Sequence, residues 1–306
     1  MKRCFLNERL KNIFLKNRDM RFIKMTGGLG NQMFIYAFYM RMKKHYSNTR
    51  IDLSDMVHYK AHNGYEMHRV FNLPPIEFRI NQPLKKVIEF LFFKKIYERK
   101  QVPSSLVPYD KKYFWPLLYF KGFYQSERFF ADMADDIRKA FTFNPRLSNR
   151  KTKEMSEQID HDENAVSIHV RRGDYLEPKY WKTTGCVCQL PYYLNAIAEM
   201  NKRISQPSYY VFSDDITWVK ENLPLPKAFF IDWNKGAESW QDMMLMSRCR
   251  HHIICNSTFS WWEAWLNPRE NKTVIMPERW FRHCETPDIC PDKWIKVPIN
   301  QPDSIQ

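Results

Sequence analysis

Short apolar runs alternate with amphipathic segments through the second half of the chain, and this alternation limits the fold more than any other feature. The apolar runs are rich in β-branched and aromatic residues, which is typical of buried strands. Repeated strand–helix units predict a parallel sheet with right-handed crossovers. The predicted strands are 165–170, 209–213, 228–231, 251–255 and 273–276, and the predicted helices are 191–204, 216–223, 239–248 and 257–266.

The first half begins with one further unit of the same kind. Residues 21–25 are predicted as a strand, Thr26-Gly-Gly-Leu-Gly-Asn-Gln32 as a turn, and 33–45 as a helix. The glycines lack the G-x-G-x-x-G spacing of a dinucleotide site, and no Gly-Lys-Ser/Thr follows as in a Walker loop. Free backbone amides at such a helix start can bind an anion, although the glycines can also serve only to reverse the chain.

With 306 residues the chain can form two domains of ordinary size. The polar stretch 144–163 is the predicted boundary between an N-terminal domain, 21–150, and a C-terminal domain, 160–306, with a basic extension at 1–20. The less regular elements of the first half are a strand at 50–53, a basic helix at 85–95, a strand at 117–123, and a helix at 127–141 capped by Ser126.

The run Ala165-Val-Ser-Ile-His-Val-Arg-Arg-Gly-Asp-Tyr175 carries the strongest sign of a binding site. Its strand delivers His169, Arg171, Arg172 and Asp174 to the carboxyl end of a sheet, where α/β proteins bind ligands. An arginine there offers a permanently charged fork that fits phosphate. Neighbouring side chains of an extended chain point opposite ways, so we expect one arginine at the ligand and the other, with Asp174, supporting the loop. A solvated Arg–Asp turn is the alternative.

Two more strand ends reach the same edge if the sheet is parallel. One carries Asp214 and Asp215, which could accept hydrogen bonds from guanine or ribose, or could cap the next helix. The other carries Asn256, Ser257 and Thr258 at a helix start, where hydroxyl and free N–H groups could bind phosphate. A capping role for Ser257 or Thr258 is the alternative, and the two roles are compatible.

Three motifs follow one another along the chain: Gly27-Gly-Leu-Gly-Asn-Gln-Met33, His169-Val-Arg-Arg-Gly-Asp174 and Asn256-Ser-Thr-Phe-Ser-Trp-Trp262. The second resembles the His-x-Arg-Arg-x-Asp signature of the α-1,2-, α-1,6- and protein O-fucosyltransferase superfamily. The ordered set, from about residue 21 to 277, resembles the α-1,2-fucosyltransferase family, glycosyltransferase family 11. The chain departs from the expected family pattern at Glu263, where a small residue after Trp-Trp is usual.

The resemblance implies an α/β fold of the GT-B type: two Rossmann-like domains facing across a cleft, with a doubly wound, mostly parallel sheet in the C-terminal one. It implies inverting transfer of L-fucose from GDP-β-L-fucose to the 2-hydroxyl of a terminal β-galactoside. The adjacent aspartates are not the Asp-x-Asp pair that holds Mn²⁺ in the other glycosyltransferase architecture. We therefore expect no metal and no cofactor besides the donor substrate. Fucosyl transfer with another linkage, α-1,6 or to protein, is the alternative among enzymes.

We expect the reaction centre to contain Arg171, Asp174 and Asn31. The catalytic base stays open, since Asp174, Glu177 and the departing phosphate are all candidates. The wider donor-binding set that the resemblance implies is Gly30, Asn31, Gln32, His169, Arg171, Asp214, Asp215, Asn256, Ser257, Thr258, Phe259 and Ser260.

Composition narrows the choice of partners. The net charge of +14 favours an acidic partner: nucleic acid, an anionic membrane or a phosphorylated small molecule. A basic chain with many aromatic residues could bind single-stranded nucleic acid by charge and stacking. However, the aromatic residues fall mostly on apolar faces, and no RNA-binding motif is present. We expect GDP-fucose and a β-galactoside glycan as partners, no nucleic acid and no required protein partner.

The sequence shows no run of about 20 apolar residues that could cross a bilayer, and its first ten residues lack a signal-peptide core. Apolar residues from Leu6 to Phe14 have helical spacing among basic ones, a pattern that can lie on an anionic membrane. A helix packed on its own domain, or a leader before a later start, is the preferred interpretation. We expect a cytoplasmic protein. Peripheral contact with the inner face of a membrane is the alternative.

Cysteine and histidine are close together at Cys249, His251, His252 and Cys255. The ligand types suit a metal, but the spacing is not that of a zinc site and the run is predicted as a strand with alternate residues on opposite faces. We expect reduced core cysteines and a reducing compartment.

Overall fold

The computed structural model describes residues 21–299 apart from 58, 60, 61, 77, 82, 84, 87–118 and 287. The extension 1–20 and most of the helix predicted at 85–95 lie outside the described residues. None of the helices described combines the length with the apolar composition that a bilayer span requires.

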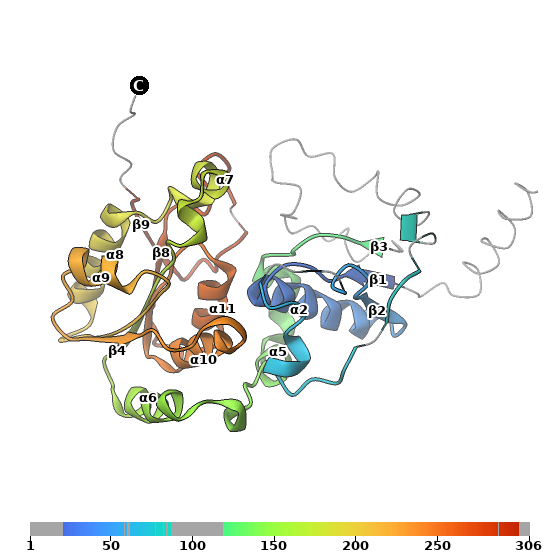
Figure 1. The fold of residues 1–306 in the computed structure, drawn as a ribbon, viewed down its shortest axis with the longest axis horizontal. Helices are drawn as coiled ribbons and strands as arrows, with labels where there is room; N and C mark the ends of the chain where they lie inside the picture. Colours follow the sequence, from blue (N-terminus) through green and yellow to red (C-terminus); the bar gives the residue numbers. More distant parts are fainter. Residues whose placement is uncertain are drawn as a thin grey trace, which may run out of the picture.

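The described C-terminal half contains a six-stranded parallel sheet, as the alternation predicted (Figure 1). Its strands are β4 (Ala165–Val170), β5 (Ser208–Ser213), β6 (Ala228–Ile231), β7 (His251–Ile253), β8 (Val274–Pro277) and β9 (Ile295–Val297). They lie in the order β6-β5-β4-β7-β8-β9, and each neighbouring pair is parallel. The first strand of this half is therefore central, and later strands extend the sheet on both sides, which is the doubly wound pattern.

Helices cover both faces of this sheet. They are α6 (Arg150–His161), α8 (Leu190–Arg203), α9 (Ile216–Asn222), α10 (Trp240–Arg248) and α11 (Thr258–Leu266). On β4, Val166 and Ile168 share a hydrophobic cluster with α8 and α9, whereas Ala165 belongs to a cluster with α6 and α10. Alternate residues of a strand point to opposite faces, so each layer of helices has an apolar surface to cover.

The described N-terminal half contains a smaller parallel sheet in the order β2-β1-β3. Its strands are β1 (Arg21–Lys24), β2 (Thr49–Asp52) and β3 (Tyr119–Phe120), and its helices include α2 (Leu29–His45), α3 (Met67–Val70) and α5 (Ala134–Ala140). The first strand, glycine segment and helix form the predicted strand–turn–helix unit.

The two halves are joined by a shared aromatic core between α2 and α11, which lie side by side in Figure 1. The ring centroid of Phe34 lies 4.5 Å from that of Trp261 and 4.8 Å from that of Trp262. The indole N–H of Trp262 donates to the carbonyl of Gly30 at 2.9 Å. A Cβ atom on Gly30 would lie 2.7 Å from the backbone of Thr258, so only glycine permits this close approach.

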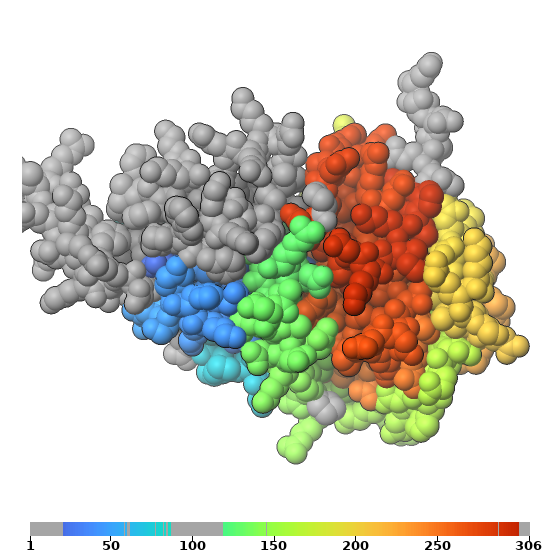
Figure 2. Space-filling view, turned by 180° about the vertical axis from the view of Figure 1, so that it is seen from behind, coloured from blue at the N-terminus to red at the C-terminus, as the bar shows by residue number. Residues whose placement is uncertain are grey.

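The chain between the halves also contributes to this core. Figure 2 shows the segment that starts at residue 119 (green) lying between the N-terminal residues (blue) and the C-terminal residues (red). Within this segment, the ring of Phe130 stacks on Trp262 with centroids 5.6 Å apart. Two α/β halves joined in this way form a GT-B-like fold in which the interface between α2 and α11 is packed. The domain boundary at 150–160 stays a prediction, because this core crosses it.

The continuous helix predicted at 127–141 is wrong. The segment forms 3₁₀ turns at Glu127–Phe129 and Ala131–Met133 and then α5. The neighbours Phe129 and Phe130 are both buried; Phe129 ends the first of these turns and Phe130 lies between the two. Ser126 does cap the first turn, where it accepts from the N–H of Arg128 at 3.3 Å.

Three further boundaries differ from the sequence-based expectation. The polar stretch 144–163 contains α6, which starts at the cap Asn149 and buries Thr152 and Ile159. The helix was not predicted because most of its residues are polar or charged and only these two are buried. α2 begins at Leu29 instead of residue 33, so the later glycine-segment residues belong to its first turn. β9 is only three residues long and was not predicted.

We expect Trp262→Phe to destabilise the protein by about 1–3 kcal/mol, because it removes the indole hydrogen bond to the carbonyl of Gly30 and opens a gap. Urea unfolding followed by circular dichroism measures the loss. Trp240→Phe is the matched control, since Trp240 is buried in the same core and its indole makes no hydrogen bond to a described residue. Equal losses in the two variants would contradict the role of this hydrogen bond.

Candidate functional site

The candidate site lies at the carboxyl ends of β4 and β7, which are neighbours in the sheet. The chain leaves β4 toward β5 on one side and leaves β7 toward β8 on the other, so the connections diverge and a crevice is expected there. The segment after β4 carries Arg171, and the one after β7 carries Ser257. Arg171 Nη1 donates to Ser257 Oγ at 3.2 Å. The two segments that the sequence assigned to one site are in direct contact.

Arg171 is oriented by two neighbours. Its Nε and Nη2 donate to the two carboxylate oxygens of Asp174 at 3.0 and 2.7 Å, and its guanidinium lies 4.4 Å from the centroid of the Tyr175 ring. Burial lowers the pKa of Arg171, but Tyr175 and Asp174 outweigh it and raise the pKa, so the side chain stays charged. Asp174 was expected to support the loop together with the other arginine, but it pairs with Arg171. Tyr175 was missed, although it follows the motif directly.

Arg172 points away from this group, as expected for a neighbouring residue. Its Nε donates to Asp215 at 3.1 Å, and its guanidinium lies 4.0 Å from the centroid of the Trp218 ring. Asp215 also caps α9 by accepting from the N–H of Trp218 at 3.1 Å. Asp214 accepts from the N–H of Arg172 at 2.8 Å. The aspartate pair therefore fixes the loop, and Asp214 keeps one oxygen without a hydrogen bond to a described residue.

Ser257 caps α11, because its Oγ accepts from the N–H of Phe259 at 3.3 Å. The same oxygen accepts from Arg171. The capping role is therefore confirmed, and phosphate binding by this serine stays a prediction. The first turn of a helix has N–H groups without helical partners. Here the first turn of α11, at Thr258, touches the first turn of α2, at Gly30. Two helix ends with partial positive charge thus meet beside a guanidinium, an arrangement that favours a bound anion.

Gln32 serves the fold instead of the predicted donor contact. It is fully buried, its Nε2 donates to the carbonyls of Gly27 at 2.8 Å and Gly64 at 2.7 Å, and its Oε1 accepts from the N–H of Glu66 at 2.9 Å. Gly27 has a φ of 84°, a left-handed value that favours glycine. The glycine segment therefore reverses the chain and also builds a helix start.

Asn31 lies in the first turn of α2 and keeps an available group. Its Oδ1 accepts from Nε2 of Gln125 at 2.7 Å, and its amide nitrogen has no hydrogen-bond partner in the described part of the chain. Gln125 was missed, since nothing in the local pattern marks it.

His169 lies between β4 and α11. Its Nδ1 hydrogen-bonds to Oγ of Ser260, and its ring centroid lies 5.7 Å from that of Phe259. Burial and then the positive charge of Arg171 lower the pKa of His169 to about 3. The ring is therefore neutral and suited to a hydrogen bond with a base or ribose, but it supplies no charge for phosphate.

Asn256 has a structural role that the donor-binding prediction missed. Its Nδ2 donates to the carbonyls of Thr184 and Trp280, both at 2.9 Å, and the residue is buried. It thus ties the loops that follow β4 and β8 to the end of β7. The hydroxyl of Tyr175 reinforces this junction by donating to the carbonyl of Asn256 at 3.0 Å.

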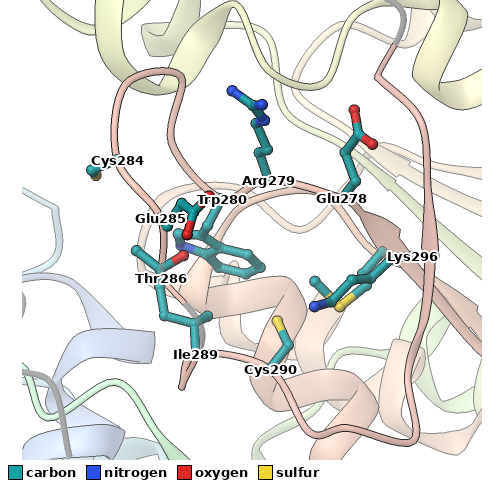
Figure 3. Close-up of a pocket in the computed structure, with 10 residues that line it drawn as sticks. Glu278, Arg279, Trp280, Cys284, Glu285, Thr286, Ile289, Cys290 and Lys296 are labelled. Atoms are coloured by element: carbon teal, nitrogen blue, oxygen red, sulfur yellow. The ribbon is translucent and has the colours of Figure 1, made fainter.

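A pocket of about 290 Å³ lies at the carboxyl end of β8. Figure 3 shows Lys296 across it from Thr286 and Ile289. Charges of both signs line the pocket, so it does not select one ligand charge and we leave it outside the donor site. The lining residues are Met276, Glu278, Arg279, Trp280, Cys284, Glu285, Thr286, Ile289, Cys290 and Lys296.

A buried polar network joins β4, β7 and α11 behind the site. Oε2 of Glu263 lies 2.9 Å from both Oγ of Ser167 and Nδ1 of His252. Nδ2 of Asn267 donates to His252 Nε2 at 2.8 Å, which assigns the ring proton to Nδ1. Burial raises the pKa of Glu263 and lowers that of His252, which favours the neutral form of each group over an ion pair.

The cysteine–histidine run is accounted for by packing. Cys249 and Cys255 are buried thiols, and His252 is engaged by the network above. Among the residues that the structure describes, no group of three or more Cys, His, Asp or Glu side chains could hold a metal ion.

Comparison with known proteins identifies the family of the chain. The sequence model described as "Glycosyl transferase family 11" matches residues 11–297. An α-1,2-colitosyltransferase of Escherichia coli is 32% identical over 292 residues, covering 90% of this chain and 97% of that one. A galactoside α-(1,2)-fucosyltransferase 1 of Ateles belzebuth is 31% identical over 160 residues, covering 49% of this chain and 43% of that one. The crystal structure of NodZ α-1,6-fucosyltransferase co-crystallized with GDP covers 85% of this chain and 95% of that chain, at 14% identity and a TM-score of 0.49.

Two α/β halves whose helix N-termini meet beside an arginine fit a glycosyltransferase. The chain belongs to glycosyl transferase family 11, since the family's sequence model spans nearly all of it.

We expect Glu263→Gln to stabilise the protein relative to wild type, and increasingly so as pH rises. Folding raises the pKa of this carboxyl above its ordinary value of 4.5. The stability that this carboxyl contributes is therefore greatest at pH values below 4.5 and falls as the pH rises toward the pKa of the folded state. The loss is at most about 1.4 kcal/mol per pH unit. The glutamine side chain does not titrate, so the variant has no such loss of stability. The contribution of His252 to the pH dependence is common to both proteins. Urea unfolding between about pH 5 and pH 8 measures the difference.

Glu263→Ala is the control for this experiment. It leaves the hydrogen-bonding groups of Ser167 and His252 unpaired, so we expect a loss of about 2–4 kcal/mol near pH 5. This loss should shrink as pH rises, because alanine, like glutamine, lacks the titrating carboxyl. A gain in Glu263→Gln that does not grow with pH would show that Glu263 is ionised in the folded protein.

Proposed function

We propose that the protein transfers L-fucose from GDP-β-L-fucose to the 2-hydroxyl of a terminal β-galactoside, with inversion and without a metal ion. The names of its relatives support this reaction, because one is an α-1,2-colitosyltransferase and another a galactoside α-(1,2)-fucosyltransferase. The α-1,6 and protein-linked alternatives find no such support among the curated relatives named above.

The observation that carries the proposal is the meeting of Arg171 with the N-terminal ends of α2 and α11. The Arg171 side chain is 26% exposed, so its charge is accessible to a ligand. Partial positive charge at two helix ends and a full charge on the guanidinium match the negative charge of a diphosphate. These groups do the electrostatic work that a cation does in other transferases.

The reaction needs most help at the leaving group. As the bond from C1 of the sugar to the diphosphate oxygen lengthens, positive charge develops on the sugar and negative charge on GDP. Preorganised donors around the diphosphate stabilise this transition state more than the ground state. In this proposal His169 and the second oxygen of Asp214 bind the nucleoside end, and the amide nitrogen of Asn31 donates to the diphosphate from α2.

Colitose is the second candidate for the transferred sugar. The relative that is 32% identical over 90% of this chain is a colitosyltransferase. The groups above contact the shared diphosphate, so they do not distinguish the two sugars. Peripheral contact with an anionic membrane through residues 1–20 stays a prediction.

We expect the purified protein to transfer fucose from GDP-fucose to lactose in the presence of EDTA, because protein groups neutralise the diphosphate. Mass spectrometry with linkage analysis of the product identifies the bond, and a parallel assay with the corresponding colitose donor identifies the sugar. GDP should raise the melting temperature, whereas a single-stranded oligonucleotide should not. A product with another linkage, or activity that requires a divalent cation, would contradict the proposal.

We expect Arg171→Ala to lower kcat about 10²–10³-fold, the usual cost of removing one donor to a developing anion. Arg171→Lys should restore only part of the rate, because lysine keeps the charge but loses the planar fork. Arg203→Ala, on the exposed end of α8, is the control and should be unaffected. Near-normal turnover in a folded Arg171→Ala protein would remove this arginine from the mechanism.

A further inference from the structure

His62 has a backbone conformation that is rare for its residue type. Its φ is 55°, in the left-handed region that costs a non-glycine residue about 1–2 kcal/mol. Such conformations persist where the surrounding structure imposes them, and they cluster at functional sites. His62 belongs to none of the three sequence motifs.

The segment that carries His62 is anchored from both halves of the molecule. From α2, the buried Gln32 donates to the carbonyl of Gly64 at 2.7 Å. From the C-terminal half, the carbonyl of Gly236 accepts from Nδ2 of Asn63 at 2.9 Å. Asn63 and Gly64, the two residues that follow His62, are therefore both held in place. This explains how the strained conformation is maintained.

The imidazole of His62 lies against the start of α2. A Cβ atom on Gly28 would lie 3.2 Å from its Cγ atom. Two residues further along, Gly30 touches Thr258 at the start of α11. His62 thus lies beside the place where the two helix N-termini meet, on the side of the N-terminal half.

In the described part of the chain, the charged groups that face His62 are Arg171 and Asp174, both from the loop after β4. From its own segment, the Tyr59 ring lies 6.3 Å away between centroids. Burial against α2, followed by the positive charge of Arg171, lowers the pKa of His62, and Asp174 opposes this shift. The ring remains exposed on its other side and makes no hydrogen bond to a described residue. A neutral imidazole there has a nitrogen free to accept a proton.

We propose that His62 is the general base that takes the proton of the acceptor hydroxyl, an assignment that rests on the proposed function. The acceptor oxygen bonds to C1 of the sugar as its O–H bond breaks, and the proton passes to an imidazole nitrogen. The bond from C1 to the diphosphate breaks, and its electron pair leaves with GDP. The imidazolium then releases the proton to water. His62 comes from the N-terminal half and Arg171 from the C-terminal half, so in this proposal the base and the leaving-group contact approach C1 from different halves, as an inverting displacement needs.

The carboxylates in the loop after β4 are less suited to this task. Both oxygens of Asp174 accept from Arg171. Burial would raise the pKa of Asp174, but Arg171 outweighs it and holds the pKa below its usual range, which makes Asp174 a weak base. Glu177 is exposed at the end of the 3₁₀ turn. If the departing phosphate takes the proton instead, no protein group is needed and substitution of His62 leaves turnover unchanged. Substitution of His62 therefore distinguishes the two routes for the proton.

His62→Asn tests the proposal, because asparagine tolerates the left-handed backbone but cannot take the proton. We expect kcat to fall about 10²–10⁴-fold, while KM for GDP-fucose and the calorimetric affinity for GDP change less than about threefold. In wild type kcat/KM should fall as pH drops through the region below 6.5, where the ring becomes protonated, and the variant should lose this dependence. His62→Gly, which fits the backbone without strain, should regain activity with added imidazole.

His68→Asn, an exposed histidine on α3, is the matched control and should retain full activity. A His62→Asn enzyme with kcat within about threefold of wild type overturns the base assignment and leaves the proposed function standing. Equal loss of GDP affinity and kcat, without imidazole rescue, also overturns it, since it reveals a structural role. Wild-type protein that binds GDP but transfers no sugar to any β-galactoside overturns the proposed function and the base together.

Discussion

The contact between the first turns of α2 and α11 is the constraint on which the rest of the structure depends. Two helix N-termini with partial charge of the same sign are brought together there, which is unfavourable by itself. The missing side chain of Gly30 permits the approach, and the burial of Trp261 and Trp262 against Phe34 stabilises it. The two helix ends create a region of positive potential, and a bound anion would offset the repulsion between them. The stability of the aromatic core is thus coupled to the electrostatics of the site.

Rigid supports surround this region on the C-terminal side. Arg171 is held by a carboxylate and an aromatic ring, and Arg172 is held by a different pair of the same kinds. Behind them, the neutral network of Glu263 fixes α11 against β4 and β7. Preorganised groups need not rearrange as charge develops, which is what electrostatic stabilisation of a leaving group requires. At Glu263 the chain departs from the family pattern. The carboxyl of this residue has a hydrogen-bond partner in His252, and such a partner lowers the cost of burying it in the core.

The packed interface also limits how the halves can move. A GT-B-type enzyme is expected to bind its substrates between two domains, yet here the interface at α2 and α11 is continuous core. The segment around His62 is anchored to both halves at the same time. Any opening that admits substrate must therefore leave this core intact, because breaking it would expose several large aromatic side chains.

The sequence by itself determined five of the six strands of the larger sheet and the segments that converge on the site, because strand patterning and the order of elements are local properties. It placed Arg171 and Ser257 together, since parallel strands deliver their carboxyl ends to one edge. Only the tertiary structure decided which groups remain free for a ligand. Gln32 and Asn256 are of types that bind sugars and phosphates, but backbone groups distant in sequence occupy their amides. Whether a polar atom is available depends on every neighbour that folding brings to it, and His62 faces Arg171 only because two chain segments far apart in sequence fold against each other.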